Sequence, residues 1–155
     1  MDKTQTADVS ATPTTKPSWL IKFQAVARYG MTAMFLFTGV VHLISPETFV
    51  KAVPPYLPFP YAIAILSGIA ELILAVGIAI DKTRWFAAWG AILLFIAVFP
   101  ANVYMYQHGA ELFPEIPEWA LLIRLPLQLV LIAWAYFIRN PILGDRPKPI
   151  APLAS

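Results

Sequence analysis

Four long apolar segments, separated by short polar ones, restrict what this chain can fold into more than any other feature. A helix needs about 20 mostly apolar residues to cross a bilayer, and each segment reaches that length. Helices of a soluble protein would also present a polar stripe to water, whereas residues 63–80 contain only Ser67 and Glu71 as clearly polar side chains. We therefore predict four membrane spans, at residues 24–44, 61–80, 85–106 and 119–138.

The composition agrees with a membrane protein. Only 13% of the 155 residues are charged, about half of the roughly 25% typical of soluble domains. The chain has no cysteine, which excludes a disulfide scaffold and a thiolate metal site. Its basic residues form no cluster interleaved with aromatic ones, so the sequence does not support nucleic-acid binding.

The predicted fold class is all-α: an antiparallel bundle of four transmembrane helices within a membrane domain at residues 19–138. Residues 1–18 are rich in Thr, Ser and Pro and predict a disordered N-terminal tail. Residues 139–155 hold four prolines and predict an irregular C-terminal tail. The lipid bilayer is the expected surrounding of the domain.

A short interfacial helix is predicted between the first two spans. Ser45 can cap a helix, Pro46 suits its first position, and Glu47 can pair with Lys51 four residues on.

The Lys and Arg residues predict the orientation. Lysine and arginine are retained on the cytoplasmic side of a membrane. Lys51 stands alone on one side, and Arg28 and Arg124 lie inside spans, so both termini are expected in the cytoplasm. The other eight basic residues share that side: Lys3, Lys16, Lys22, Lys82, Arg84, Arg139, Arg146 and Lys148.

Polar residues from all four spans fall in one layer of the predicted bundle. Counting at about 1.5 Å per residue puts His42 and Asn102 near the outer ends of their spans, and Glu71 and Gln128 near the middle. Arg124 lies about one and a half turns inward from the outer side. The candidate buried polar cluster or ligand-binding site comprises Glu71, Arg124, Gln128, Asn102, His42 and Ser67.

Two interpretations of this layer stay open. A charge at the bilayer centre costs roughly 3 kcal/mol, so we expect Glu71 and Arg124 to face inward and to pair, directly or through Gln128 or water. The pair could fix the register of the helices, or it could line a pocket for a polar or quinone-like head group that opens toward the outer surface.

Other chemistry finds little support in the sequence. The two histidines lack a ligand spacing, so no metal site is expected. No cofactor motif or catalytic constellation is evident. Pro100 and Pro126 free the carbonyl groups of Ile96 and Leu122, which either accept hydrogen bonds from polar side chains or mark packing kinks.

The order of PPYLPFP, SGIAELILAVGI, AVFPANVYM and RLPLQLVLIAWAY, from Arg28 to Tyr136, resembles the DoxX-like family of small bacterial four-helix membrane proteins. The resemblance implies a multi-pass protein of the bacterial inner membrane and a link to redox or oxidative-stress physiology. Some members of that family are subunits of a thiosulfate:quinone oxidoreductase. The resemblance identifies no catalytic residues in this chain.

These observations favour an accessory or small-ligand-binding membrane subunit, with a quinone as a conceivable ligand and no catalytic role of its own. A small-solute transporter is the alternative, and it would require a homo-oligomer because four spans make a narrow bundle. A true quinone oxidoreductase subunit within a membrane redox complex is a third hypothesis.

Overall fold

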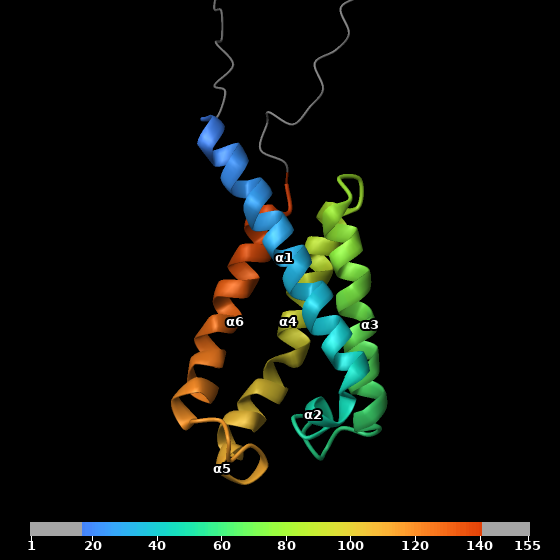
Figure 1. Ribbon diagram of the computed structural model, residues 1–155, viewed down its shortest axis with the longest axis vertical. Coiled ribbons are helices and arrows are strands. Elements are labelled where there is room, and N and C mark those ends of the chain that lie inside the picture. The colour runs from blue at the N-terminus through green and yellow to red at the C-terminus, as the bar shows by residue number, and fades with distance from the viewer. Residues whose placement is uncertain (1–16, 141–155) are drawn as a thin grey trace, which may run out of the picture.

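The computed structural model describes residues 17–140, and this part of the chain is helical throughout, with no strand (Figure 1). Four of the helices in this range are long and apolar enough to cross a membrane. The six helices of the described residues are α1 (Ser18–Ile44), α2 (Pro46–Val50), α3 (Pro60–Ala79), α4 (Arg84–Gln107), α5 (Gly109–Leu112) and α6 (Glu118–Ile138).

Helices α3, α4 and α6 begin and end within one residue of the ranges expected for the spans. Helix α1 differs, because it begins at Ser18, six residues before the expected start. Pro17 precedes it in an extended conformation, and residues 18–23 contain no glycine or proline to stop the helix. The short helix α5 lies in a segment expected to be a loop. The two expected tails fall largely outside the described residues.

The four long helices follow one another in alternating directions, so that the turn between α3 and α4 lies at the same end as the start of α1 (Figure 1). Helix α1 packs against α3, α3 against α4, and α4 against α6, while α1 and α6 meet less extensively. In the part of the chain that is described, α3 and α6 do not contact each other. They therefore lie diagonally across the assembly.

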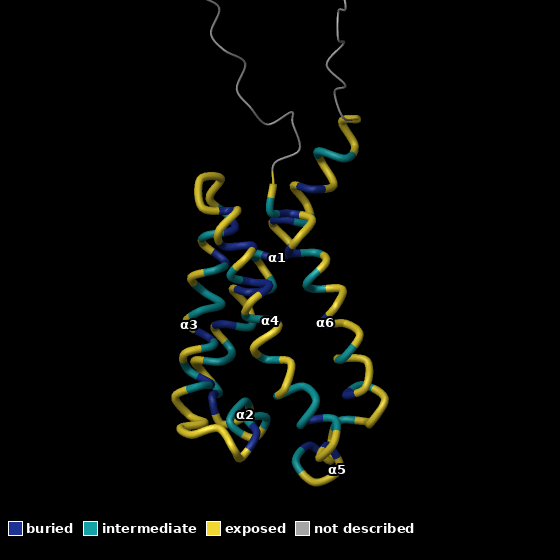
Figure 2. Tube along the Cα trace, turned by 180° about the vertical axis from the view of Figure 1, so that it is seen from behind, coloured by how far each residue is buried: buried dark blue, intermediate teal, exposed yellow. Residues whose placement is uncertain are grey.

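The main apolar core occupies the end near the α3–α4 turn. Buried positions concentrate there (Figure 2). Towards the other end a smaller cluster of Met105, Phe113 and Leu121 joins α4, α6 and the segment between them. The core residues are Met31, Phe35, Ala75, Ile78, Ala87, Ala91, Ile92, Phe95, Ala135 and Ile138.

Large apolar side chains cover the outer surfaces of all four long helices. Val26, Phe37, Ile73, Phe86 and Leu129, for example, are each more than half exposed. A contiguous surface of this kind is unfavourable in water and favourable against lipid chains. The outward faces are therefore suited to a membrane environment.

Helices α1 and α3 approach most closely at two glycines. A Cβ atom on Gly39 would lie 2.9 Å from the carbonyl oxygen of Gly68. A Cβ atom on Gly68 would lie 2.5 Å from the Cβ atom of His42. Small residues at such a crossing let two helix backbones come together, which is a common device in membranes. This contact also brings His42 up to α3.

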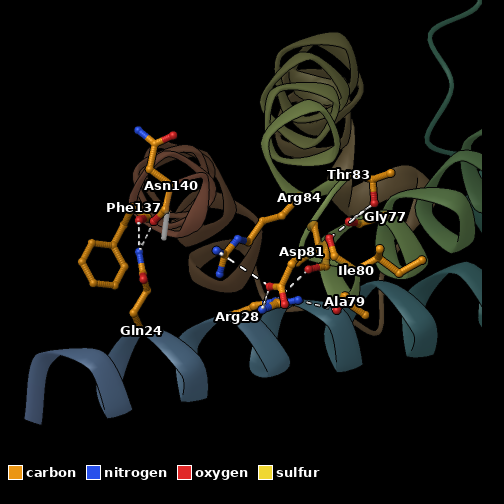
Figure 3. A network of polar contacts seen from close by, with 11 residues as sticks. Gln24, Arg28, Gly77, Ala79, Ile80, Asp81, Thr83, Arg84, Phe137 and Asn140 are labelled. Carbon is orange, nitrogen blue, oxygen red and sulfur yellow. Dashed lines mark hydrogen bonds and ion pairs between the residues drawn. The ribbon is translucent and has the colours of Figure 1, made fainter. Parts of the chain in front are cut away.

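A polar network closes the end of the molecule near the α3–α4 turn (Figure 3). The Arg28 side chain of α1 is buried, and it donates from Nε to the carbonyl oxygen of Ile78 at 2.8 Å and from Nη1 to Asp81 Oδ1 at 2.6 Å. Its Nη2 donates to the carbonyl oxygen of Ala79. The last carbonyl groups of a helix lack partners within the helix, so Arg28 caps the end of α3.

Gln24, one turn earlier on α1, caps the end of α6. Its Nε2 donates to the carbonyl oxygens of Phe137 at 3.0 Å and Asn140 at 2.7 Å (Figure 3). In addition, Trp134 Nε1 donates to the carbonyl oxygen of Ala27 at 2.9 Å. One face of α1 thus holds the C-terminal ends of two other helices.

Helix α2 occupies the predicted position, with Pro46 in its first turn. Two local expectations were wrong. The Ser45 side chain makes no capping hydrogen bond, and the backbone there adopts φ −132° and ψ 59°, outside the usual cap conformation. Among the described residues, the ion pairs join Asp81 to Arg28 and Arg84, not Glu47 to Lys51. Glu47 and Lys51 are both exposed, where such a pair gains little.

We expect Arg28→Met to lower the free energy of unfolding by about 2 kcal/mol, because it leaves the carbonyl groups at the end of α3 without their donor. Most of the loss comes from these carbonyl groups, since the Asp81 side chain is 72% exposed and contributes little as an ion pair. Reversible unfolding by dodecyl sulfate in mixed micelles measures the change. Lys22→Met, at an exposed position of the same helix, is the control. Equal stability of the two variants would contradict the capping role.

We expect Gly68→Ala to destabilise the protein by about 1–3 kcal/mol through overpacking. The new methyl group meets the Cβ atom of His42, which can move only with the α1 backbone. Gly90→Ala is the matched control, because its methyl group meets the flexible end of the Leu74 side chain at 2.7 Å. The same unfolding measurement applies. A Gly68→Ala variant as stable as Gly90→Ala would show that the helix crossing is not tightly packed.

Candidate functional site

A cavity of about 270 Å³ lies between the long helices, on the side of the core away from the α3–α4 turn. All six residues of the candidate cluster line it: His42 from α1, Ser67 and Glu71 from α3, Asn102 from α4, and Arg124 and Gln128 from α6. The remaining lining is almost entirely apolar. Its other residues are Met34, Phe35, Thr38, Phe49, Ala52, Val53, Ile63, Ala64, Leu94, Phe95, Val98, Ala101, Met105 and Leu131.

Helical spacing explains why these side chains face the same space. Ser67 and Glu71 are four residues apart on α3, and Arg124, Gln128 and Leu131 follow the same face of α6. The buried residues of α1 include Arg28, Phe35 and Gly39, and His42 continues that seam. Helical spacing thus puts pairs of these residues on one helix face, and the packing of four helices brings the faces together.

His42 and Ser67 form a hydrogen-bonded group with the backbone of α3. His42 Nδ1 lies 3.1 Å from the carbonyl oxygen of Ala64 and 3.0 Å from Ser67 Oγ. Ser67 Oγ also lies 2.9 Å from the same carbonyl oxygen. The imidazole ring stacks on Phe49 of α2, with 3.4 Å between the ring centroids. These contacts hold the imidazole between α1, α2 and α3.

Asn102 and Gln128 form a second satisfied group. Asn102 Nδ2 donates to Gln128 Oε1 at 2.8 Å, and Gln128 Nε2 donates to the carbonyl oxygen of Phe95. Gln128 is buried and has both ends of its amide engaged. The accepting carbonyl belongs to Phe95, one residue before the Ile96 carbonyl that Pro100 was expected to free. This chain of hydrogen bonds joins α4 to α6.

Glu71 and Arg124 differ from the other four residues. Glu71 Oε2 is buried and has no hydrogen-bond partner within residues 17–140. The polar neighbour of the carboxyl group is the Thr38 hydroxyl, which is within hydrogen-bonding reach of Glu71 and also lies 3.0 Å from the carbonyl oxygen of Met34. Arg124 makes no hydrogen bond or ion pair with any other described residue. Both groups therefore keep hydrogen-bonding capacity directed at the cavity.

Direct pairing of Glu71 with Arg124, one of the expected arrangements, does not occur among the described residues. The physical reason is the order of the helices: α3 and α6 are diagonal, their described backbones do not approach closely, and both side chains line the cavity between them. Gln128 does not bridge them either, because its amide is engaged by Asn102 and Phe95.

The site can offer two complementary polar groups to a ligand. A guanidinium group only donates hydrogen bonds, and a carboxylate only accepts them. They face the cavity from α6 and α3, within an apolar lining that includes the stacked rings of Phe35 and Phe95, whose centroids are 5.4 Å apart. Apolar pockets with few polar groups are typical of small-molecule sites.

Within residues 17–140, no three His, Asp or Glu side chains lie close enough together to hold a metal ion. A second hollow of about 450 Å³ lies beside α5, and Glu118 is the charged residue that lines it. It lacks the opposed polar groups of the first cavity.

Thr38 and Phe49 line the cavity without having been predicted. Thr38 lies next to Gly39 on α1, and its position three residues after Phe35 could have indicated an inward face. Phe49 belongs to the interfacial helix. No sequence signal indicates that this helix folds back over His42, because the contact depends on the path of the intervening chain.

We expect Asn102 and Gln128 to be coupled in stability. Asn102→Leu and Gln128→Leu should each be destabilising, and a double-mutant cycle should give an interaction energy of about 1 kcal/mol, the usual scale for a hydrogen bond between membrane helices. Unfolding in mixed micelles measures all four proteins. Strictly additive effects would contradict a hydrogen bond between these two side chains.

Comparison with known proteins adds one match. Residues 31–139 match a protein family described as Domain of unknown function (DUF8561), and this range includes all six candidate residues. Searches of curated proteins and of solved structures found no match to the chain. Since the match covers well over half of the chain, the protein belongs to the DUF8561 family.

Proposed function

We propose that this protein is a multi-pass membrane protein in which α1, α3, α4 and α6 form an antiparallel transmembrane bundle. Three observations support the proposal. The four helices have the required length and apolarity, their outward faces carry large apolar side chains, and their polar side chains turn to the cavity or to helix ends. Helix α2 would lie at the membrane surface.

The proposed orientation places both termini in the cytoplasm of a bacterial cell, with the bundle in the inner membrane. The start of α1, the α3–α4 turn and the end of α6 lie at one end of the molecule (Figure 1). Lys22, Lys82, Arg84 and Arg139 belong to that end. Their common location supports the orientation, because cytoplasmic segments retain basic residues.

We further propose that the cavity binds a small ligand between Glu71 and Arg124. The observation that carries this proposal is that Glu71 Oε2 and the Arg124 guanidinium group have no partner among the described residues and line a space that could hold a ligand. Charged side chains that serve only to fix helix register would be expected to engage each other or the backbone, as Arg28 does. Intramembrane charges left open toward a cavity are typical of functional sites.

The ligand that the site suits best is a small ring with oxygen substituents, as in a quinone or quinol head group. Arg124 could donate to one oxygen, Glu71 could engage another, and Phe35, Phe95 and Phe49 supply aromatic surface. The resemblance to the DoxX-like family favours the same class. We therefore propose an accessory, quinone-linked role in membrane redox or oxidative-stress physiology, either as a homo-oligomer or beside a redox partner.

We expect Glu71→Gln and Arg124→Met each to weaken quinone binding about tenfold or more, because a hydrogen bond to a charged group contributes roughly 1.5–3 kcal/mol. Decyl-ubiquinone binding to the purified protein in nanodiscs can be followed through tryptophan fluorescence. Glu115→Gln and Lys82→Met, at exposed positions outside the cavity, are the controls and should bind like the unaltered protein.

Stability separates the ligand role from a structural one. The Glu71 and Arg124 variants should unfold at the same dodecyl sulfate concentration as the unaltered protein, since Arg124 engages no other described residue and glutamine keeps an oxygen that the Thr38 hydroxyl can reach. Failure of the unaltered protein to bind any quinone or quinol, or unchanged binding by the double variant, would contradict the proposed site.

A further inference from the structure

Apolar side chains border the cavity toward both ends of the helices. On the core side, Phe35 and Phe95 stack across it between α1 and α4. On the opposite side, Ala52 packs against the cluster of Met105, Phe113 and Leu121. Phe49 adds cover by stacking on the His42 ring. Apolar residues therefore border the cavity at both ends.

Of the four pairs of adjacent long helices around the cavity, α1 and α6 pack together least extensively. Their contacts gather near the capped end, where Phe23 meets Phe137 and Trp134 meets Ala27 and Gly30. Helix α2 covers α1 and α3, and α5 covers α4 and α6. Neither short helix bridges α1 and α6.

Arg124 lies where the cavity meets the surface of the protein. It lines the cavity and is nevertheless exposed, whereas Gln128, one turn further along α6, is buried. Met34 of α1 and Leu131 of α6 line the cavity and also pack on the core. They lie where the core and the cavity adjoin. The exposed side chains beside Arg124 on α6, Leu122, Ile123 and Leu127, are apolar.

We infer that ligands reach this cavity sideways, from the lipid, between α1 and α6, so that the ligand is a membrane-dissolved amphiphile with a compact polar head and an apolar chain. The head lies between Glu71 and Arg124, and the chain leaves past Met34 and Leu131 toward the lipid. This inference rests on the proposed ligand-binding function and adds the class of ligand and its route.

The route explains features that a water-borne solute would not require. An apolar lining with two polar groups suits a ring that has already left water. Exposed apolar residues around Arg124 would hinder a hydrated solute, but they would pack against an alkyl chain. The long arginine side chain can also extend along such a surface while its guanidinium group meets a polar head.

The experiment compares two probes with the same benzoquinone head, decyl-ubiquinone and its analogue without a chain, on the full-length protein in nanodiscs. Affinities are expressed per mole fraction of probe in the bilayer, which removes the effect of partitioning. We expect the decyl probe to bind at least tenfold more tightly on this scale. Equal affinities would overturn the inference that the chain is part of the recognised ligand.

Blocking the opening tests the route itself. Leu131→Trp should weaken binding of the decyl probe at least tenfold, while Leu129→Trp, on an exposed position of the same helix, should leave it unchanged. Met34→Trp places a blocking side chain on α1 instead, and it replaces Leu131→Trp in the experiment if that variant unfolds. Unchanged binding in a folded blocking variant would overturn the lateral route. Absence of binding by either probe to the unaltered protein would instead refute the proposed function.

Discussion

The capping of α3 by Arg28 is the interaction on which the arrangement of the helices depends. Within lipid, the terminal carbonyl groups of a helix and a charged side chain must both find partners in the protein. Arg28 meets both needs at once, and Gln24 caps α6 from the same face of α1. The polar contacts and the main apolar core hold the helices together at one end. Toward the other end α1 and α6 diverge (Figure 1), while α1 and α3 stay in close contact at Gly39 and Gly68.

The cavity at the looser end contains two kinds of polar group. His42 with Ser67, and Asn102 with Gln128, are satisfied by one another and by nearby carbonyl groups. They join neighbouring helices and shape the walls. Glu71 Oε2 and the Arg124 guanidinium group have no hydrogen-bond partner among the described residues. Four members of the polar layer thus have structural contacts, and the other two carry the proposed ligand site.

The sequence predicted much of the fold and part of the site. Apolar length predicted α3, α4 and α6 to within one residue, whereas the start of α1 was missed because the polar-to-apolar transition at Trp19 to Gln24 is gradual. Counting residues along the spans placed the six candidate residues in one layer. It did not reveal that Thr38 and Phe49 line the same cavity, nor that Arg28 would reach Asp81. Those contacts depend on how helices distant in the sequence lie together.

By itself, the sequence determined the number of long apolar helices and which side of each carries polar residues, because length and helical period are local properties of the chain. The order of the helices around the cavity was decided only by tertiary packing. Close contact at Gly39 and Gly68 sets α1 against α3, and α6 then lies diagonally from α3. For this reason Glu71 and Arg124, which any charge-pairing argument joins, face each other across a cavity.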